Sequence, residues 1–212
     1  MLLRKANVVD GALALLDETG LDGLTMRRLG EALGVRASAL YRHFSCKQAL
    51  LDAMAERILE SIDLTLEPGP WDERGLVLAG RLRHALLRHR DGARVVAGAY
   101  TAEAHTVLFG NTSAALLREA GLPPRQAAWA VMAVSQYVIG HTIEEQARAD
   151  LVDGGSWPRR MEAFAALADD VAFSAFDADP QERFAYGLRL FLNGIRHELA
   201  TPYAPQYCNG TP

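Results

Sequence analysis

Residues 36–47 bring together side chains that are suited to contact nucleic acid. Arg42 can donate two hydrogen bonds to the O6 and N7 atoms of guanine or bind a phosphate. Tyr41 and His43 are suited to phosphate oxygens, and the small residues before them would let a helix approach base edges closely. The predicted DNA-contacting set is Arg27, Arg36, Ala37, Ser38, Ala39, Tyr41, Arg42, His43 and Lys47.

The remaining reactive side chains do not match a known catalytic pattern. The sequence has no glycine-rich phosphate loop, no nucleophile elbow and no Cys/His cluster. His84 and His89 are five residues apart, which places them on different faces of a helix. We therefore expect a protein that is not an enzyme, with no catalytic residues and no cofactor.

Metal and thiol chemistry are weaker alternatives. His141 with Glu144 or Glu145 has a usable spacing for a metal ion, but a single such pair is common by chance, so we expect no metal site. Cys46 and Cys208 are the only cysteines, too few for a disulfide framework, and are expected to be free thiols. A metal- or thiol-responsive regulator, or a small helical enzyme, remains the alternative.

The elements that would position the basic residues are two short helices with a tight turn between them. Thr25 is a good N-cap for a helix over 26–33, Gly34 ends it, and a second helix is expected over 37–44. This is the plan of a helix-turn-helix, with the second helix in the major groove. On spacing alone, an ordinary three-helix bundle with a basic, solvated face is the alternative.

Helical periodicity continues through the rest of the chain, and no strand pattern is visible. An earlier helix is expected over 7–19, and Ser45 with Gln48 forms a capping-box pattern before a helix reaching residue 62. The predicted fold is all-α, with a head at 1–47, a connecting helix at 48–66, a ligand-binding and dimerisation body at 67–200 and a loosely ordered tail at 201–212. Further helices are expected over 71–90, 93–99, 103–120, 125–148, 159–171 and 180–199.

Charge and hydropathy fit a protein that contacts nucleic acid with one end only. The net charge is −4 over 212 residues, yet residues 1–47 carry seven Lys/Arg against five Asp/Glu, a local charge of +2. Half of the residues are hydrophobic, enough for a sizeable core, but no window is long and apolar enough to span a membrane. With no signal-peptide pattern at the start, we expect a cytoplasmic protein that does not contact membranes.

Three segments of the head together resemble the signature of the tetracycline-repressor family. They are GLTMRRLGEALGV at 23–35, ALYRHF at 39–44 and KQALL at 47–51. The resemblance implies an all-helical homodimer that binds a roughly palindromic operator in double-stranded DNA. It also implies a pocket for a small-molecule inducer in each body, and it leaves repression or activation open.

The body is similar to members of the family that bind tetracycline, in RHALLRHRDGA at 83–93, AVSQYVIG at 133–140 and IEEQ at 143–146. The positions that hold the drug and its magnesium ion in those members have changed here. By this alignment they are Asp63, Leu78, Leu82, Val96 and Ala99, and only the acidic Glu144 persists. Because valine cannot bind a cation, we expect an apolar ligand without an obligatory metal.

The predicted ligand pocket combines apolar walls with a few polar groups. Its residues are Leu78, Leu82, Val96, Phe109, Trp129 and Met132, with Asp63, Ser113, Gln136 and Glu144 as polar contacts. The alternative is plain core for the apolar residues and a salt bridge for Glu144. Two long helices, at 125–148 and 181–199, are expected to form a four-helix dimer interface through Phe184, Leu188, Phe191 and Ile195; a monomer is the alternative.

Overall fold

The computed structural model describes residues 4–99, 103–167, 169, 173–174 and 177–201. Every regular element in this part of the chain is a helix, as predicted. The helices are α1 (Lys5–Gly23), α2 (Met26–Ala32), α3 (Ala37–Leu40), α4 (Lys47–Glu60), α5 (Trp71–Leu87), α6 (Gly92–Ala97), α7 (Ala104–Glu119), α8 (Pro124–Asp153), α9 (Trp157–Ala165) and α11 (Pro180–Ala200).

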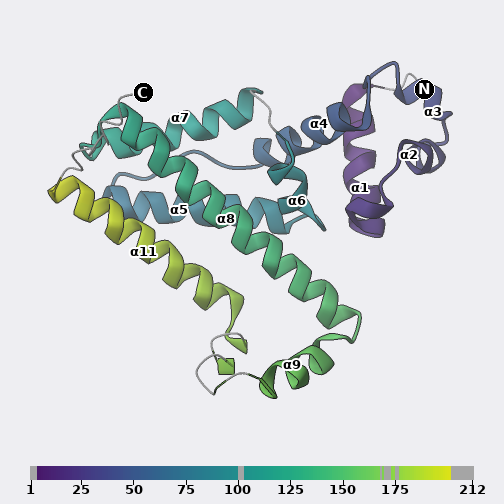
Figure 1. Ribbon diagram of the computed structural model, residues 1–212. Coiled ribbons are helices and arrows are strands. Elements are labelled where there is room, and N and C mark those ends of the chain that lie inside the picture. The colour runs from purple at the N-terminus through teal and green to yellow at the C-terminus, as the bar shows by residue number, and fades with distance from the viewer. Residues whose placement is uncertain (1–3, 100–102, 168, 170–172, 175–176, 202–212) are drawn as a thin grey trace, which may run out of the picture.

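Helices α1, α2 and α3 form a small unit at one end of the molecule (Figure 1). Apolar residues from α1, α2 and α3 pack in its centre, among them Leu16, Leu29 and Leu40, which have no exposed surface. Burial of three leucines stabilises this unit by several kcal/mol, at about 1.5–3 kcal/mol for each side chain. The core therefore fixes α2 and α3 relative to α1.

Helix α1 is kinked near its end, and the kink links the head to the body. Gly20 has a φ of 68°, in the left-handed region that glycine adopts without steric cost. The amide of Leu21, just after the kink, donates to the Asp91 carboxylate at 2.7 Å. Asp91 lies between α5 and α6, so this hydrogen bond joins two segments that are 70 residues apart.

Helix α4 connects the head to the body, as Figure 1 shows. It buries Leu50, Met54 and Ile58 and ends at Glu60, so residues 61–66 of the expected connecting helix lie outside it. The predicted capping box is wrong, because the N-cap is Cys46 and makes no side-chain cap hydrogen bond. The Gln48 side chain instead donates to Asp52 and to the Gly98 carbonyl.

The body is built from α5, α7, α8 and α11, with α6 packed between α8 and α4. Arg83 of α5 and Glu145 of α8 form an ion pair at 2.6 Å, with side chains only 13% and 17% exposed. Arg83 also lies over the Phe184 ring of α11, 5.0 Å from its centroid. These contacts fix α5, α8 and α11 to one another.

Two predicted helix starts are confirmed by their caps. Thr25 accepts a hydrogen bond from the amide of Arg28 at the start of α2, and Asp179 accepts from the amides of Gln181 and Glu182 at the start of α11. No helix in the described part of the chain is long and apolar enough to cross a membrane. The predicted tail after Thr201 lies outside the described residues.

Candidate DNA-contact surface and ligand cavity

The turn between α2 and α3 depends on two glycines. Gly34 has a φ of 66°, which ends α2 and reverses the chain. Gly30 lets the two helices approach closely, because a Cβ there would lie 2.9 Å from the Val35 carbonyl oxygen and 3.1 Å from the Ala37 nitrogen. The sequence thus forms the tight helix-turn-helix that was predicted, with α2 and α3 in van der Waals contact.

Helix α3 is shorter than predicted. It ends at Leu40, and residues 41–43 form a turn. The amide of Phe44 donates to the Leu40 carbonyl at 3.0 Å, so this turn has the hydrogen-bond pattern of a single helical turn. Leu40 and Phe44 are both buried, whereas Tyr41 and Arg42 between them are exposed and His43 is half-buried.

All nine residues predicted to contact DNA are at least partly accessible in the chain. Tyr41 is 51% exposed, and Arg42 is also exposed. Arg27 pairs with Glu31 at 2.8 Å on the surface of α2, a pair that costs little to break when a phosphate replaces the carboxylate. The exposed members are Arg27, Arg36, Ser38, Tyr41 and Arg42, and the half-buried ones are Ala37, Ala39, His43 and Lys47.

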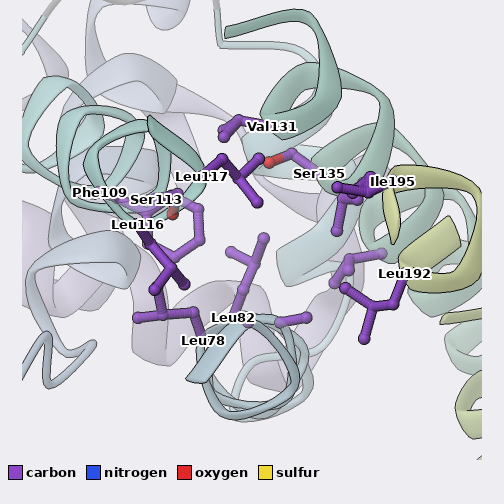
Figure 2. A pocket seen from close by; sticks show the side chains of 14 residues that line it. Leu78, Leu82, Phe109, Ser113, Leu116, Leu117, Val131, Ser135, Leu192 and Ile195 are labelled. Atoms are coloured by element: carbon purple, nitrogen blue, oxygen red, sulfur yellow. The ribbon is translucent and has the colours of Figure 1, made fainter. Parts of the chain in front are cut away.

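A small apolar cavity lies in the body between α5, α7, α8 and α11 (Figure 2). Its volume is about 50 Å³, well below the roughly 300–1,000 Å³ of typical small-molecule pockets. The lining residues are Gly75, Leu78, Ala79, Leu82, Phe109, Ser113, Leu116, Leu117, Val131, Val134, Ser135, Val138, Leu192 and Ile195. The cavity therefore suits an apolar group, and a larger ligand would have to separate its walls.

Two serines, Ser113 and Ser135, line the cavity, and they differ in the state of their hydroxyl groups. The hydroxyl oxygen of Ser113 is buried and has no hydrogen-bond partner among the described residues. A buried, unpaired hydroxyl costs about 1–3 kcal/mol relative to one that is satisfied. A ligand with one polar atom placed near Ser113 would remove that cost, so this position favours a mostly apolar molecule carrying at least one hydrogen-bonding group.

The predicted ligand residues divide into those that line this cavity and those that do not. Leu78, Leu82, Phe109 and Ser113 line it. Val96 of α6 packs against the core but is not in the cavity wall. The others lie at the surface: Asp63 pairs with Arg81 at 3.3 Å, and Trp129, Met132, Gln136 and Glu144 are at least partly exposed on α8.

Sequence reasoning missed the face of α8 that lines the cavity. The lining residues Val131, Val134 and Val138 follow helical spacing, as do Trp129 and Met132 on a different face. Both sets are apolar, so periodicity alone does not distinguish them. The clue available in the sequence was that one set is made of β-branched valines that repeat at intervals of three and four residues.

An open apolar groove also lies between α8 and α11 on the outer surface of the chain. It has a volume of about 680 Å³, and its lining includes Trp129, Ala133, Leu190, Phe191 and Gly194. Trp129 and Met132 nearby are 52% and 58% exposed. Such a contiguous apolar surface is typical of a protein–protein interface.

The four residues predicted for the dimer interface lie mostly inside the chain. Phe184 and Leu188 are 3% and 2% exposed, and Ile195 is also buried, because they pack into the apolar core of the same chain. Phe191 is half-buried and lines the outer groove, and the edge of Ile195 also lines that groove. The accessible face of α11 is the adjacent one, which carries Tyr186 and Leu190.

The described residues contain no group of three or more His, Cys, Asp or Glu side chains able to hold a metal ion. Cys46 is a free, exposed thiol at the start of α4. A hydrogen bond from the Ala49 amide lowers the pKa of this thiol. Cys208 lies outside the described residues.

Two family models match the chain and together cover most of it. Residues 8–54 match "Bacterial regulatory proteins, tetR family". Residues 65–199 match "Tetracyclin repressor-like, C-terminal domain". The boundary between the two matches falls in the segment that joins α4 to α5.

Similar proteins include a tetracycline repressor, a structure solved with minocycline and a structure solved with DNA. The class A tetracycline repressor from transposon 1721 of Escherichia coli is 37% identical over 198 residues, covering 91% of this chain and 90% of the relative. A variant of TetR from Acinetobacter baumannii AYE, solved in complex with minocycline, has a TM-score of 0.74 at 35% identity, over 93% and 99% of the two chains. BioQ bound to its natural double-stranded DNA operator has a TM-score of 0.72 at 30% identity, over 92% and 99%.

Proposed function

The chain belongs to the tetracycline-repressor family of bacterial regulatory proteins, and from that premise we propose a homodimeric repressor that an apolar small molecule releases from its operator. DNA binding by the head is supported by the geometry of α2 and α3 and by the operator complex of a relative. As a DNA-binding regulator, the protein would act in the cytoplasm, and this function requires no catalytic residue. The proposed division remains a head at 1–47, a connecting segment at 48–66 that is helical as far as Glu60, and a body at 67–200.

The observation that carries the ligand proposal is the cavity in the body. Its walls are apolar apart from two serines, and Leu78 and Leu82 stand where tetracycline-binding members are expected to hold their drug with polar groups. The hydroxyl of Ser113 is the one hydrogen-bonding atom in this cavity that is buried without a partner among the described residues. Together these features favour an aliphatic or flat aromatic molecule with one polar group, bound without a metal ion.

The remaining predicted ligand residues lie outside the cavity wall and would contact only a ligand that extends beyond it. Val96 is adjacent to the core and would contact a ligand that extends towards α6. Asp63, Gln136 and Glu144 are at least partly exposed in the chain, so they would contact a ligand only near an entrance to the cavity. Trp129 and Met132 are better explained as interface residues.

The dimer interface is proposed on the exposed face of α8 and α11. A second copy related by twofold symmetry would present the same two helices and cover the groove with an identical surface. Gly194 lines this groove and has open space around it, which allows a partner helix to approach. Of the four residues predicted for the interface, Phe191 and the largely buried Ile195 line this groove.

A two-part screen tests the proposal. Thermal-shift measurements on the full chain against hydrophobic metabolites and antibiotics would identify stabilising compounds, and each would then be tested for release of DNA selected on the protein from a random double-stranded pool. We expect a stabilising apolar compound to release DNA without added metal. Release that requires magnesium would contradict the proposed ligand class, and so would release caused only by polar compounds.

A further inference from the structure

Helix α7 receives the cap of its first turn from another helix. Its own N-cap residue, Glu103, makes no side-chain cap hydrogen bond. The carboxylate of Glu56 in α4 instead accepts hydrogen bonds from the backbone amides of His105 and Thr106, at 2.5 and 3.2 Å. The Thr106 hydroxyl also donates to Glu56 at 3.1 Å, and the Nδ1 atom of His105 lies 2.8 Å from it.

Glu56 is ionised in this position despite its partial burial. Burial of the side chain favours the neutral acid, but the hydrogen bonds from His105 and Thr106 outweigh that effect and hold the pKa of Glu56 below its usual value. A carboxylate at a helix N-terminus is further stabilised by the helix dipole. The contact between α4 and α7 is therefore a charged, multiply hydrogen-bonded one.

The next residue along α4 is bonded to the head. Arg57 pairs with Asp10 of α1 at 3.1 Å and with Glu60 at 2.8 Å. Consecutive residues of α4 thus attach this helix to α7 in the body and to α1 in the head. A displacement of the first turn of α7 would pull on α4 beside its attachment to the head.

The same α7 forms one wall of the ligand cavity. Phe109, Ser113, Leu116 and Leu117 all belong to it, and Phe109 is one helical turn from Thr106. Because the cavity holds only about 50 Å³, a ligand of ordinary size must push its walls apart. An outward shift of α7 would reach α4 through the cap.

From these contacts we infer that Glu56 is a positioning residue that couples the ligand cavity to the DNA-binding head. The inference rests on the proposed function and adds to it the residue through which the two sites communicate. Coupling is reciprocal, so DNA binding at the head must also alter the stability of the first turn of α7. That reciprocity allows a test with no knowledge of the ligand.

The test measures hydrogen exchange in α7 with and without DNA. Double-stranded DNA is first selected on the full-length protein from a random pool, and exchange is then followed in peptides covering residues 103–109. In the unmodified protein, we expect bound DNA to slow or accelerate exchange there by about threefold or more. In Glu56→Ala this DNA-dependent difference should disappear, while DNA affinity stays within about threefold of the original value.

Asp52→Ala is the matched control, because it removes a carboxylate one turn earlier in α4 that accepts a hydrogen bond from Gln48 of the same helix. It should keep the DNA-dependent difference. Loss of the cap alone raises exchange in Glu56→Ala without DNA, so only the effect of DNA is compared. If Glu56→Ala does not fold, Glu56→Gln replaces it, and a reduced difference is expected because the amide keeps an acceptor but loses the charge.

Each outcome has a distinct meaning. A DNA-dependent difference that persists in Glu56→Ala, or one that is absent from the unmodified protein bound to DNA, overturns the coupling and leaves the proposed function intact. Failure of the selection to yield any bound DNA overturns the proposed function and the coupling with it. Loss of the difference in Asp52→Ala also overturns the assignment to Glu56, since the effect would then belong to α4 as a whole.

Discussion

Replacing Ser113 with alanine should stabilise the protein and weaken its response to ligand. The hydroxyl is buried without a partner among the described residues, and such a group costs about 1–3 kcal/mol. Alanine also has a higher helix propensity than serine, by about 0.5 kcal/mol, and position 113 is inside α7. Because removal of the hydroxyl also gives up some van der Waals packing, we expect a net gain of about 1.5 kcal/mol.

Thermal unfolding provides the assay for this gain. For a chain of this length, about 1.5 kcal/mol corresponds to a rise in Tm of about 3–6 °C. Unmodified and variant proteins must be compared at one concentration, because the Tm of a dimer depends on concentration. Ser135→Ala is the matched control, since Ser135 lines the same cavity but its hydroxyl is not among the buried atoms left without a partner.

The same substitution should lower the affinity for ligand while it raises the thermal stability. A compound that bonds to the Ser113 hydroxyl should bind Ser113→Ala about 2–12-fold more weakly, which is the usual worth of one neutral hydrogen bond. The variant would then be more stable alone and less stabilised by ligand. A fall in Tm would refute the reasoning, because it would mean that the Ser113 hydroxyl already has a hydrogen-bond partner. An equal rise in Ser135→Ala would also refute it, because the gain would then not come from removal of an unpaired hydroxyl.

Four further substitutions test the head and the body. Gly30→Ala places a Cβ 2.9 Å from a backbone oxygen, so we expect a stability loss of about 1–3 kcal/mol by calorimetry and weakened DNA binding. Arg42→Ala should weaken binding of selected DNA by about 5–150-fold in an anisotropy titration. Lys47→Ala should reduce the slope of log affinity against log salt by about one. Glu145→Ala leaves the mostly buried Arg83 without its carboxylate partner, so chemical denaturation should show a loss of about 3 kcal/mol or more.

The head could be predicted from sequence because its signals are local. Thr25, Gly34 and the buried Leu40 lie within sixteen residues of one another, and each has a structural requirement that few residue types meet. The start of α11 at Asp179 was predictable for the same reason. The capping box at Ser45 failed because Gln48 has partners outside its own turn, one of them in the segment after α6.

The cavity and the dimer face were harder to predict because both depend on how long helices are rotated about their axes. Helix α8 is apolar on several sides, so Met132 was as reasonable a cavity residue as Val131 until α5 and α7 were placed. In α11, the apolar stripe through Leu188 faces its own chain, and the proposed partner-facing side is less continuous in sequence. The cap that Glu56 gives to α7 joins residues 49 apart, which no local pattern reveals.

The small size of the cavity is itself part of the proposed mechanism. A pocket already open in the DNA-binding state would accept ligand in both states, and a ligand with equal affinity for two states shifts neither. A cavity of about 50 Å³ must instead be enlarged on binding, so the ligand would favour a conformation in which the helices around it, α7 among them, have separated. Because Glu56 and Arg57 attach α4 to α7 on one side and to α1 on the other, a shift of α7 would be passed to the head. Apolar selectivity and release from DNA would then have one physical origin, the separation of the walls of a small and almost wholly apolar cavity.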